Sequence, residues 1–217
     1  MNMRSYQKKF IEFLIHHHAL KFGEFILKSG RKSPYFFNLG AFNTGNALSQ
    51  LGKFYAETLE TSGLQYDMLF GPAYKGIPLV SATTIALSEQ YKKNIPYFFN
   101  RKEAKDHGES GLFVGATLKG HVVMLDDVIT AGTTVRETVS QLENTAAHLS
   151  GIIIAFDRQE RGLSNLSAVQ ETVRNFNIPI QSIINLSDVI QYLSEKPEFK
   201  NHVKSIEKYR DAFGAII

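Results

Sequence analysis

Residues 122–134 read VVMLDDVITAGTT, and this stretch decides the fold. Val122 to Leu125 are apolar and include two β-branched valines, which is typical of a buried strand. The strand ends at two adjacent carboxylates, Asp126 and Asp127, and a Thr-Ala-Gly-Thr-Thr turn follows over 130–134. We therefore expect the two acids at the carboxyl edge of a sheet, where open α/β folds bind their ligands.

The turn after the acids has the character of an anion site. Val135, Val139 and Leu142 follow it at helical spacing, so the turn precedes a helix. Unpaired N–H groups and the positive dipole end of such a helix favour a phosphate. An ordinary capped strand-to-helix turn is the alternative for any fragment of this stretch, but it accounts poorly for the whole.

Two other nucleotide-binding patterns are absent. Gly71 and Gly76 have the glycine spacing of a P-loop, but Ile77 and Pro78 stand where that motif needs Lys and then Ser or Thr. No G-x-G occurs in the sequence, so the dinucleotide-binding fingerprint is missing as well.

The composition predicts one domain spanning 1–217. Of the 217 residues, 43% are hydrophobic, which allows one sizeable core but not two catalytic domains. Lys and Arg number 24 against 21 acidic residues, and the net charge of +3 does not by itself indicate nucleic-acid binding. The absence of cysteine excludes disulfide and thiolate chemistry. No stretch fits a signal peptide or a membrane span, so we expect a cytoplasmic protein with neither nucleic acid nor membrane as a partner.

The hydrophobic periodicity predicts an α/β fold, with a central, mostly parallel sheet and helices on both faces. Strands are expected at 68–70, 95–99, 122–125, 152–156 and 180–184. Helices are expected at 6–17, 47–63, from 78, from the motif to about 147, at 166–176, and, as peripheral elements, at 187–193 and 199–213. Short strands at 20–27 and 34–38 predict a small N-terminal hood over about residues 18–45.

Two further segments carry charge beside predicted strand ends. Residues 71–76 follow the first core strand, so their backbone N–H groups and Lys75 face the same sheet edge as Asp126. Residues 100–111 are dense in charge and contain one apolar side chain, Ala104, which indicates a long surface loop. A loop of this kind can close over a polyanion as a lid, and a solvated connector is the alternative.

The acidic pair and its turn resemble the phosphoribosyl-pyrophosphate (PRPP) motif of the type I phosphoribosyltransferases. The likeness covers nearly the whole chain and is closest to the members of that family that use orotate. The segments that carry it are 20–25, 27–38, 70–78, 100–109, 122–134 and 157–162. The resemblance implies transfer of the 5-phosphoribosyl group from PRPP to orotate, which gives orotidine 5′-monophosphate and pyrophosphate in pyrimidine biosynthesis. It also implies Mg²⁺ held mainly through PRPP, with no direct protein ligand, and a homodimer whose charged loop reaches the neighbour's site.

The resemblance assigns roles to residues of this sequence. It implies Lys105, Asp126 and Asp127 as catalytic residues, with Lys105 the main contact in the transition state. The residues implied to bind PRPP are Lys28, Tyr74, Lys75, Arg101, Lys102, Lys105, His107, Asp126, Asp127, Val128, Ile129, Thr130, Ala131, Gly132, Thr133 and Thr134. Those implied to bind orotate are Phe36, Phe37, Thr130 and Arg158. A structural ion pair with Asp157 or Glu160 is the alternative for Arg158.

Two other functions stay open on the sequence alone. A phosphoribosyltransferase for a purine or for uracil shares the PRPP motif, but it has no carboxylate on its base for Arg158 to bind. A PRPP-sensing regulator that binds nucleic acid needs a basic patch outside the cleft, whereas most of the notable basic clusters here lie at 28–32 and 100–109. The intact charged loop favours an enzyme.

Overall fold

A computed structural model describes residues 3–27, 30–105, 111–162 and 164–216. Its centre is a six-stranded sheet of order β5-β4-β3-β6-β7-β8. The strands are β3 (Met68–Gly71), β4 (Tyr97–Lys105), β5 (Gly111–Gly115), β6 (Lys119–Asp126), β7 (Ala146–Asp157) and β8 (Ile180–Asn185). All neighbouring pairs are parallel except β4 and β5, which confirms the predicted α/β class with a mostly parallel sheet.

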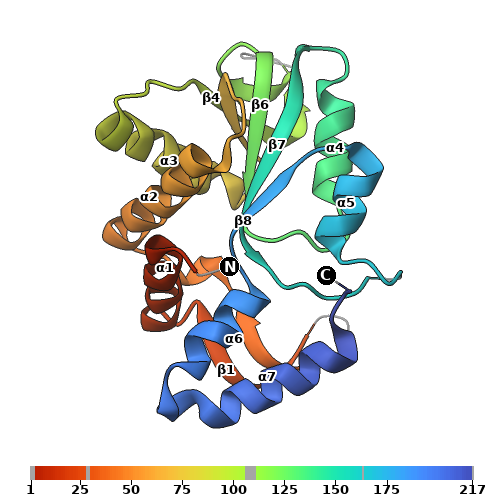
Figure 1. The fold of residues 1–217 in the computed structure, drawn as a ribbon. Helices are drawn as coiled ribbons and strands as arrows, with labels where there is room; N and C mark the ends of the chain where they lie inside the picture. The colour runs from red at the N-terminus through yellow and green to blue at the C-terminus, as the bar shows by residue number, and fades with distance from the viewer. Residues whose placement is uncertain (1–2, 28–29, 106–110, 163, 217) are drawn as a thin grey trace.

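Helices cover both faces of this sheet (Figure 1). The helices α2 (Gly45–Ser62) and α3 (Gly76–Tyr91) pack together on one face, and α4 (Thr133–Leu142) and α5 (Ala168–Phe176) lie on the other. The central strand β6 serves both layers, because successive side chains of a strand point to opposite faces. Val123 and Leu125 pack in the cluster that contains α2 and α3, whereas Val122 and Met124 pack in the cluster that contains α4.

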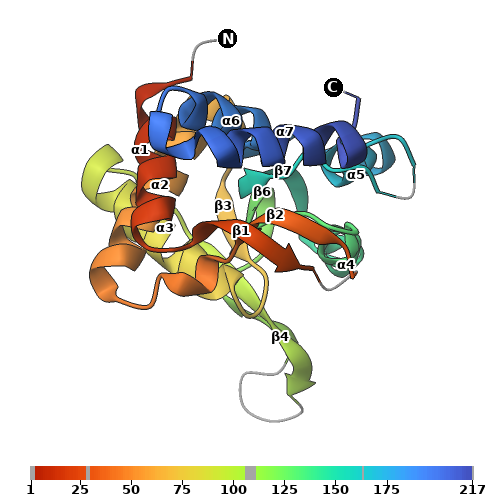
Figure 2. The same ribbon diagram turned by 90° about the horizontal axis from the view of Figure 1, so that it is seen from below.

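A two-stranded antiparallel hairpin forms the predicted hood. Its strands are β1 (Leu20–Ile26) and β2 (Lys32–Phe37), and the helix α1 (Ser5–His16) precedes it. The helix α7 (Lys200–Phe213) packs against β2, and α6 (Leu186–Ser194) packs against α7 (Figure 2). Short 3₁₀ helices occupy Leu39–Ala41 and Pro197–Phe199. The expectation that α6 and α7 are peripheral is wrong, since Leu193, Ile206 and Tyr209 are buried in the larger core cluster.

Two boundaries also differ from the expectation. The helix after the motif ends at Leu142 rather than near 147, because β7 already begins at Ala146 and pairs there with Lys119. Residues 100–105, expected in a loop, extend β4 and pair with β5, a strand that the sequence analysis missed. The end of β4 projects beyond the rest of the sheet in Figure 2. Within the described ranges, no helix is both long and apolar enough to cross a membrane.

Candidate active site

The acidic pair lies at the carboxyl edge of the sheet, as predicted. Asp126 is the last residue of β6, and its backbone carbonyl accepts a hydrogen bond of 2.8 Å from the hydroxyl of the buried Tyr55. Its Oδ1 accepts the N–H of Asp127, also at 2.8 Å. Burial raises the pKa of Asp126 to about 7, and the neighbouring charge of Asp127 adds to the rise. Asp126 can therefore hold or release a proton near neutral pH.

Asp127 joins this edge to the glycine-flanked loop. Its Oδ2 lies 2.6 Å from Nζ of Lys75, and its Oδ1 accepts the N–H of Val128 at 2.9 Å. The Lys75 side chain is 60% exposed and that of Asp127 is 13% exposed, so the ammonium group is open to a ligand while it holds the carboxylate. The two segments predicted to share a sheet edge are in direct contact.

The loop that carries Lys75 turns within a very small space. A Cβ atom on Gly71 would lie 2.1 Å from the carbonyl oxygen of Gly76, so only glycine fits at the end of β3. The helix α3 begins at Gly76, two residues before the expected Pro78. Its first N–H groups are already bonded, since that of Gly76 donates to the carbonyl of Pro72 at 2.9 Å and that of Ile77 to the carbonyl of Tyr74 at 3.3 Å. The N–H of Ala73 donates to Oδ1 of Asn100 at 2.8 Å, which ties this loop to β4.

The turn after Asp127 ends in a helix N-terminus. Gly132 is the N-cap of α4 and has φ of 66°, in the left-handed region that glycine favours. The N–H of Arg136 makes the first bond of the helix to the carbonyl of Gly132, at 3.0 Å. The N–H groups of Thr133 and Thr134 have no partner within the helix, and Thr130 and Ala131 just before them are exposed. This arrangement suits a phosphate group.

The charged segment places one cation beside the glycine loop. Nζ of Lys102 lies 4.9 Å from the centroid of the exposed Tyr74 ring, a cation–π contact. Arg101 is half-buried on the same strand extension, and the backbone of Lys105 pairs with Gly111. The predicted residues Lys28 and His107, and the side chain of Lys105, lie outside the described part of the chain.

A cavity of about 600 Å³ separates the hood from the carboxyl edge. Three of the predicted orotate residues line it, namely Phe36, Thr130 and Arg158. The fourth, Phe37, packs its ring against Phe156 with the centroids 5.2 Å apart. Adjacent residues of a strand point to opposite faces, so the two phenylalanine rings cannot both face this cavity. The other lining residues are Ile26, Leu27, Arg31, Ile129, Ala131, Asp157, Gln159, Glu160, Arg161, Gly162 and Ala168.

Arg158 makes the ion pair that the sequence analysis gave as the alternative to a ligand contact. Its Nε and Nη2 both donate to Oε1 of Glu160, at 2.9 and 2.6 Å. Burial works against the charged guanidinium, but Tyr35 and Glu160 outweigh this effect and raise the pKa of Arg158. The pairing engages one edge of the guanidinium, so it does not exclude a second anion. Glu160 was expected here only as this alternative partner of Arg158, and Tyr35 and Arg31 were not among the predicted site residues, although all three lie in the segments that carry the resemblance.

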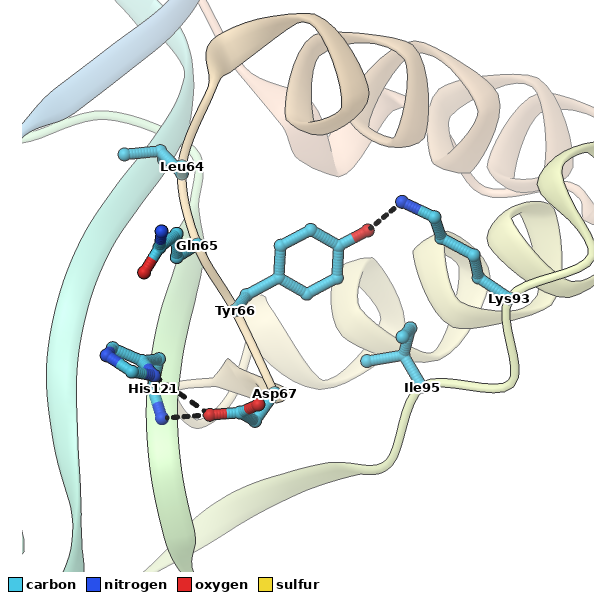
Figure 3. Close-up of a pocket in the computed structure, with 7 residues that line it drawn as sticks. All are labelled: Leu64, Gln65, Tyr66, Asp67, Lys93, Ile95 and His121. Atoms are coloured by element: carbon cyan, nitrogen blue, oxygen red, sulfur yellow. Dashed lines mark hydrogen bonds and ion pairs between the residues drawn. The ribbon is translucent and has the colours of Figure 1, made fainter.

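A second cavity, of about 590 Å³, lies at the opposite, amino edge of the sheet (Figure 3). None of the predicted site residues lines it. Its polar groups pair with one another or with near neighbours: Lys93 lies 2.7 Å from Glu60, and Nδ1 of His121 lies 2.9 Å from Asp67. The candidate active site is therefore the cavity beneath the hood. The amino-edge cavity is lined by Leu64, Gln65, Tyr66, Asp67, Lys93, Ile95 and His121.

Comparison with known proteins agrees with this geometry. Residues 41–181 match the model of the phosphoribosyl transferase domain. The orotate phosphoribosyltransferase of Shigella flexneri is 56% identical over 212 residues, which cover 98% of this chain and 100% of the relative. The enzyme of the same name from Cronobacter sakazakii is 55% identical over the same coverage. A crystal structure of orotate phosphoribosyltransferase from Francisella tularensis superposes with a TM-score of 0.88 at 42% identity, covering 95% of this chain and 100% of that one.

The fold, with its acidic strand end and its helix N-terminus, defines a phosphoribosyltransferase of the type I class. The chain belongs to the phosphoribosyltransferase family and, within it, to the orotate phosphoribosyltransferases.

Proposed function

We propose that the cavity under the hood transfers the 5-phosphoribosyl group of PRPP to orotate, with release of pyrophosphate, as a step of pyrimidine biosynthesis. One observation carries the proposal: the edge formed by the acidic pair and the start of α4 lies beside a cavity that is lined by the half-buried Arg158. The edge consists of Lys75, the acidic pair and the start of α4, and it suits the phosphates and ribose of PRPP. Arg158, in the adjoining cavity, offers a fork of donors that matches a carboxylate.

In this proposal the carboxyl edge of the sheet binds PRPP, and the cavity under the hood binds orotate. Asp126 and Asp127 position the ribose hydroxyl groups, residues 128–134 hold the 5′-phosphate, and Tyr74 and Lys75 hold the pyrophosphate. Phe36, Thr130 and Arg158 orient the orotate ring so that its nitrogen faces C1 of the ribose. Holding the two reactants in this geometry removes much of the entropic cost of their encounter.

The reaction needs positive charge at the leaving group. As the bond between ribose C1 and oxygen breaks, the sugar becomes cationic and the pyrophosphate gains negative charge. Cations aimed at the pyrophosphate therefore stabilise the transition state more than the ground state. Lys75 lies next to Tyr74 in the loop after β3, and Lys102, on β4, contacts the ring of Tyr74. Both lysines are therefore placed to face the pyrophosphate. We propose that Arg101, Lys105 and His107 act with them when the end of the β4–β5 hairpin closes over the ligand, with Lys105 as the main contact.

Mg²⁺ is the expected cofactor. Within the described residues, no group of three His, Cys, Asp or Glu side chains is arranged to hold a metal ion. Mg²⁺ keeps several waters and binds substrate phosphates, so PRPP can bring the ion to this site with no direct protein ligand. When bound, it offsets the charge of the phosphates. We propose that most of its ligands come from PRPP.

Three further features complete the proposal. The whole chain acts as one catalytic domain, with the hood over about residues 18–45 as its cover. It works in the cytoplasm as a homodimer in which each site takes its charged hairpin from the partner. No nucleic acid or membrane takes part.

The test follows the ultraviolet absorbance of orotate in the presence of PRPP and Mg²⁺, with uracil and adenine assayed alongside as bases that lack a carboxylate. We expect orotate to be consumed fastest. Faster consumption of uracil or adenine would overturn the assignment of the substrate.

A further inference from the structure

Glu160 receives four hydrogen bonds from three side chains. Its Oε1 accepts from the hydroxyl of Tyr35 at 2.8 Å and from Nε and Nη2 of Arg158. Its Oε2 accepts from Nη1 of Arg31 at 3.2 Å. The Glu160 side chain is 16% exposed, so these contacts are largely shielded from water. A shielded carboxylate with this many donors is held in one orientation and holds its donors in turn.

The contact with Glu160 determines which part of Arg158 is available to a ligand. A guanidinium carries five N–H groups in a planar fork, and Glu160 takes two of them, from Nε and Nη2. The end of the fork, formed by Nη1 and the other hydrogen of Nη2, has no protein partner in the described part of the chain. This end can bind a carboxylate in two-point fashion without breaking the ion pair. The Tyr35 ring lies 5.0 Å from the guanidinium carbon and packs against it.

The same carboxylate joins the hood to the sheet. Tyr35 belongs to β2, the strand that carries Phe36, and Arg31 directly precedes that strand. Arg158 and Glu160 follow β7, on the other side of the cavity. One side chain therefore fixes the arginine and, through Tyr35, the strand that carries the neighbouring aromatic ring.

We propose that Glu160 is a positioning residue for the ring substrate: it fixes the guanidinium of Arg158 and the hood strand so that the free end of the arginine meets the carboxylate of orotate. The inference rests on the proposed contact between Arg158 and orotate. The charges are consistent with it, because two arginines and one glutamate leave a net positive charge for a single carboxylate. If Glu160 instead competes with orotate for Arg158, its removal has the opposite effect on orotate binding.

Backbone contacts make a clean test possible. The carbonyl of Gln159 accepts the N–H of Ala215 at 2.8 Å, and the N–H of Arg161 donates to Phe213 at 2.8 Å. The side chain of Gln159 also accepts hydrogen bonds from Ser187. The loop is therefore anchored on both sides of Glu160 without its carboxylate, and Glu160→Gln keeps the shape of the side chain.

The experiment compares Glu160→Gln with Glu195→Gln, which removes the carboxylate of an exposed ion pair with Lys8 far from the cavity. We expect Glu160→Gln to raise the KM for orotate about tenfold, the size of a charge-assisted hydrogen bond, and to leave the KM for PRPP within about twofold. Glu195→Gln should change neither value. An orotate KM that is unchanged or lowered in folded Glu160→Gln overturns the inference.

A double-mutant cycle separates this inference from the function on which it rests. In an Arg158→Ala background, Glu160→Gln should raise the orotate KM by less than about a further twofold. Glu160 acts on orotate through Arg158, and this background lacks that arginine. A full additional effect there overturns the positioning role. If Arg158→Ala itself leaves the orotate KM unchanged, the proposed orotate contact fails instead.

Tyr35→Phe provides a second variant for the case in which Glu160→Gln is unstable. It removes one donor to Glu160 and changes no charge. We expect a rise of about threefold in the orotate KM and no change in the PRPP KM, and no rise at all contradicts the inference.

Discussion

Lys75 and Asp127 stand 52 positions apart in the sequence, and Nζ of the first lies 2.6 Å from Oδ2 of the second. The pair joins the loop after β3 to the loop after β6 at the point where two parallel strands end. In the free protein each side chain thus neutralises the other. Binding of PRPP must redistribute these charges, because the ammonium group then faces phosphates and the carboxylate faces the ribose.

Lys75→Met should weaken PRPP binding with little effect on stability. The lysine is 60% exposed, and exposed ion pairs contribute roughly 0–1 kcal/mol to folding. We expect the KM for PRPP to rise about tenfold while the thermal midpoint changes by no more than roughly 3 °C. Lys93→Met is the matched control, since it breaks a comparable ion pair with Glu60 at the opposite edge. Equal KM values for PRPP in the two variants would show that Lys75 does not bind PRPP.

The raised pKa of Asp126 predicts a pH-dependent stability. The folded value is about 7 and the ordinary value is 3.8, so the folded state holds a proton that the unfolded state has lost. This contribution is fully present below pH 3.8 and is lost as the pH rises through about 7. Asp126→Asn is neutral at every pH and should escape the loss. Thermal midpoints measured from pH 4 to 8 should therefore show a growing advantage of the variant, whereas parallel curves contradict the assignment.

Gly71→Ala should destabilise the fold. The added Cβ would lie 2.1 Å from the backbone oxygen of Gly76, and that atom cannot move without displacing the start of α3. Overpacking of this kind typically costs about 1–3 kcal/mol. Gly45→Ala is the control, because its Cβ meets nothing within 4 Å. Urea denaturation should show a lower midpoint for Gly71→Ala alone, and similar midpoints for both variants contradict the steric argument.

The proposed shared site predicts complementation between two inactive chains. If Lys105 of one protomer serves the site that contains Asp127 of its partner, then Lys105→Ala and Asp127→Asn place both lesions in one site of a mixed dimer. The other site is then intact. With random subunit exchange, roughly a quarter of the wild-type activity should return on mixing. If mass spectrometry detects mixed dimers and no activity returns, the hairpin acts on its own chain's site.

Local pattern was sufficient for the central elements of the fold. The run from Val122 to Leu125 is buried on both faces as predicted, because a strand with helices on each side has no polar face to show. The helix after Ala47 ends where Gly63 takes a φ of 75°, in keeping with the glycine there. Residues 100–105 escaped prediction because their charged side chains carry no hydrophobic alternation. They become a strand by pairing with β5, a partner that the periodicity does not reveal.

At the active site, too, some features follow from the local sequence and others depend on tertiary contacts. The sequence by itself determined that Asp126, Asp127 and the turn up to Thr134 lie at the end of a buried strand and the start of a helix, because these features depend on neighbours in the chain. Only the tertiary structure decided that Phe36 faces the cavity while Phe37 packs on Phe156. It also decided that Glu160 holds Arg158, Arg31 and Tyr35 together. These contacts join hood residues to Glu160, more than a hundred positions further along the chain. The distances between such residues depend on how the hood packs against the sheet, and no local sequence pattern reveals them.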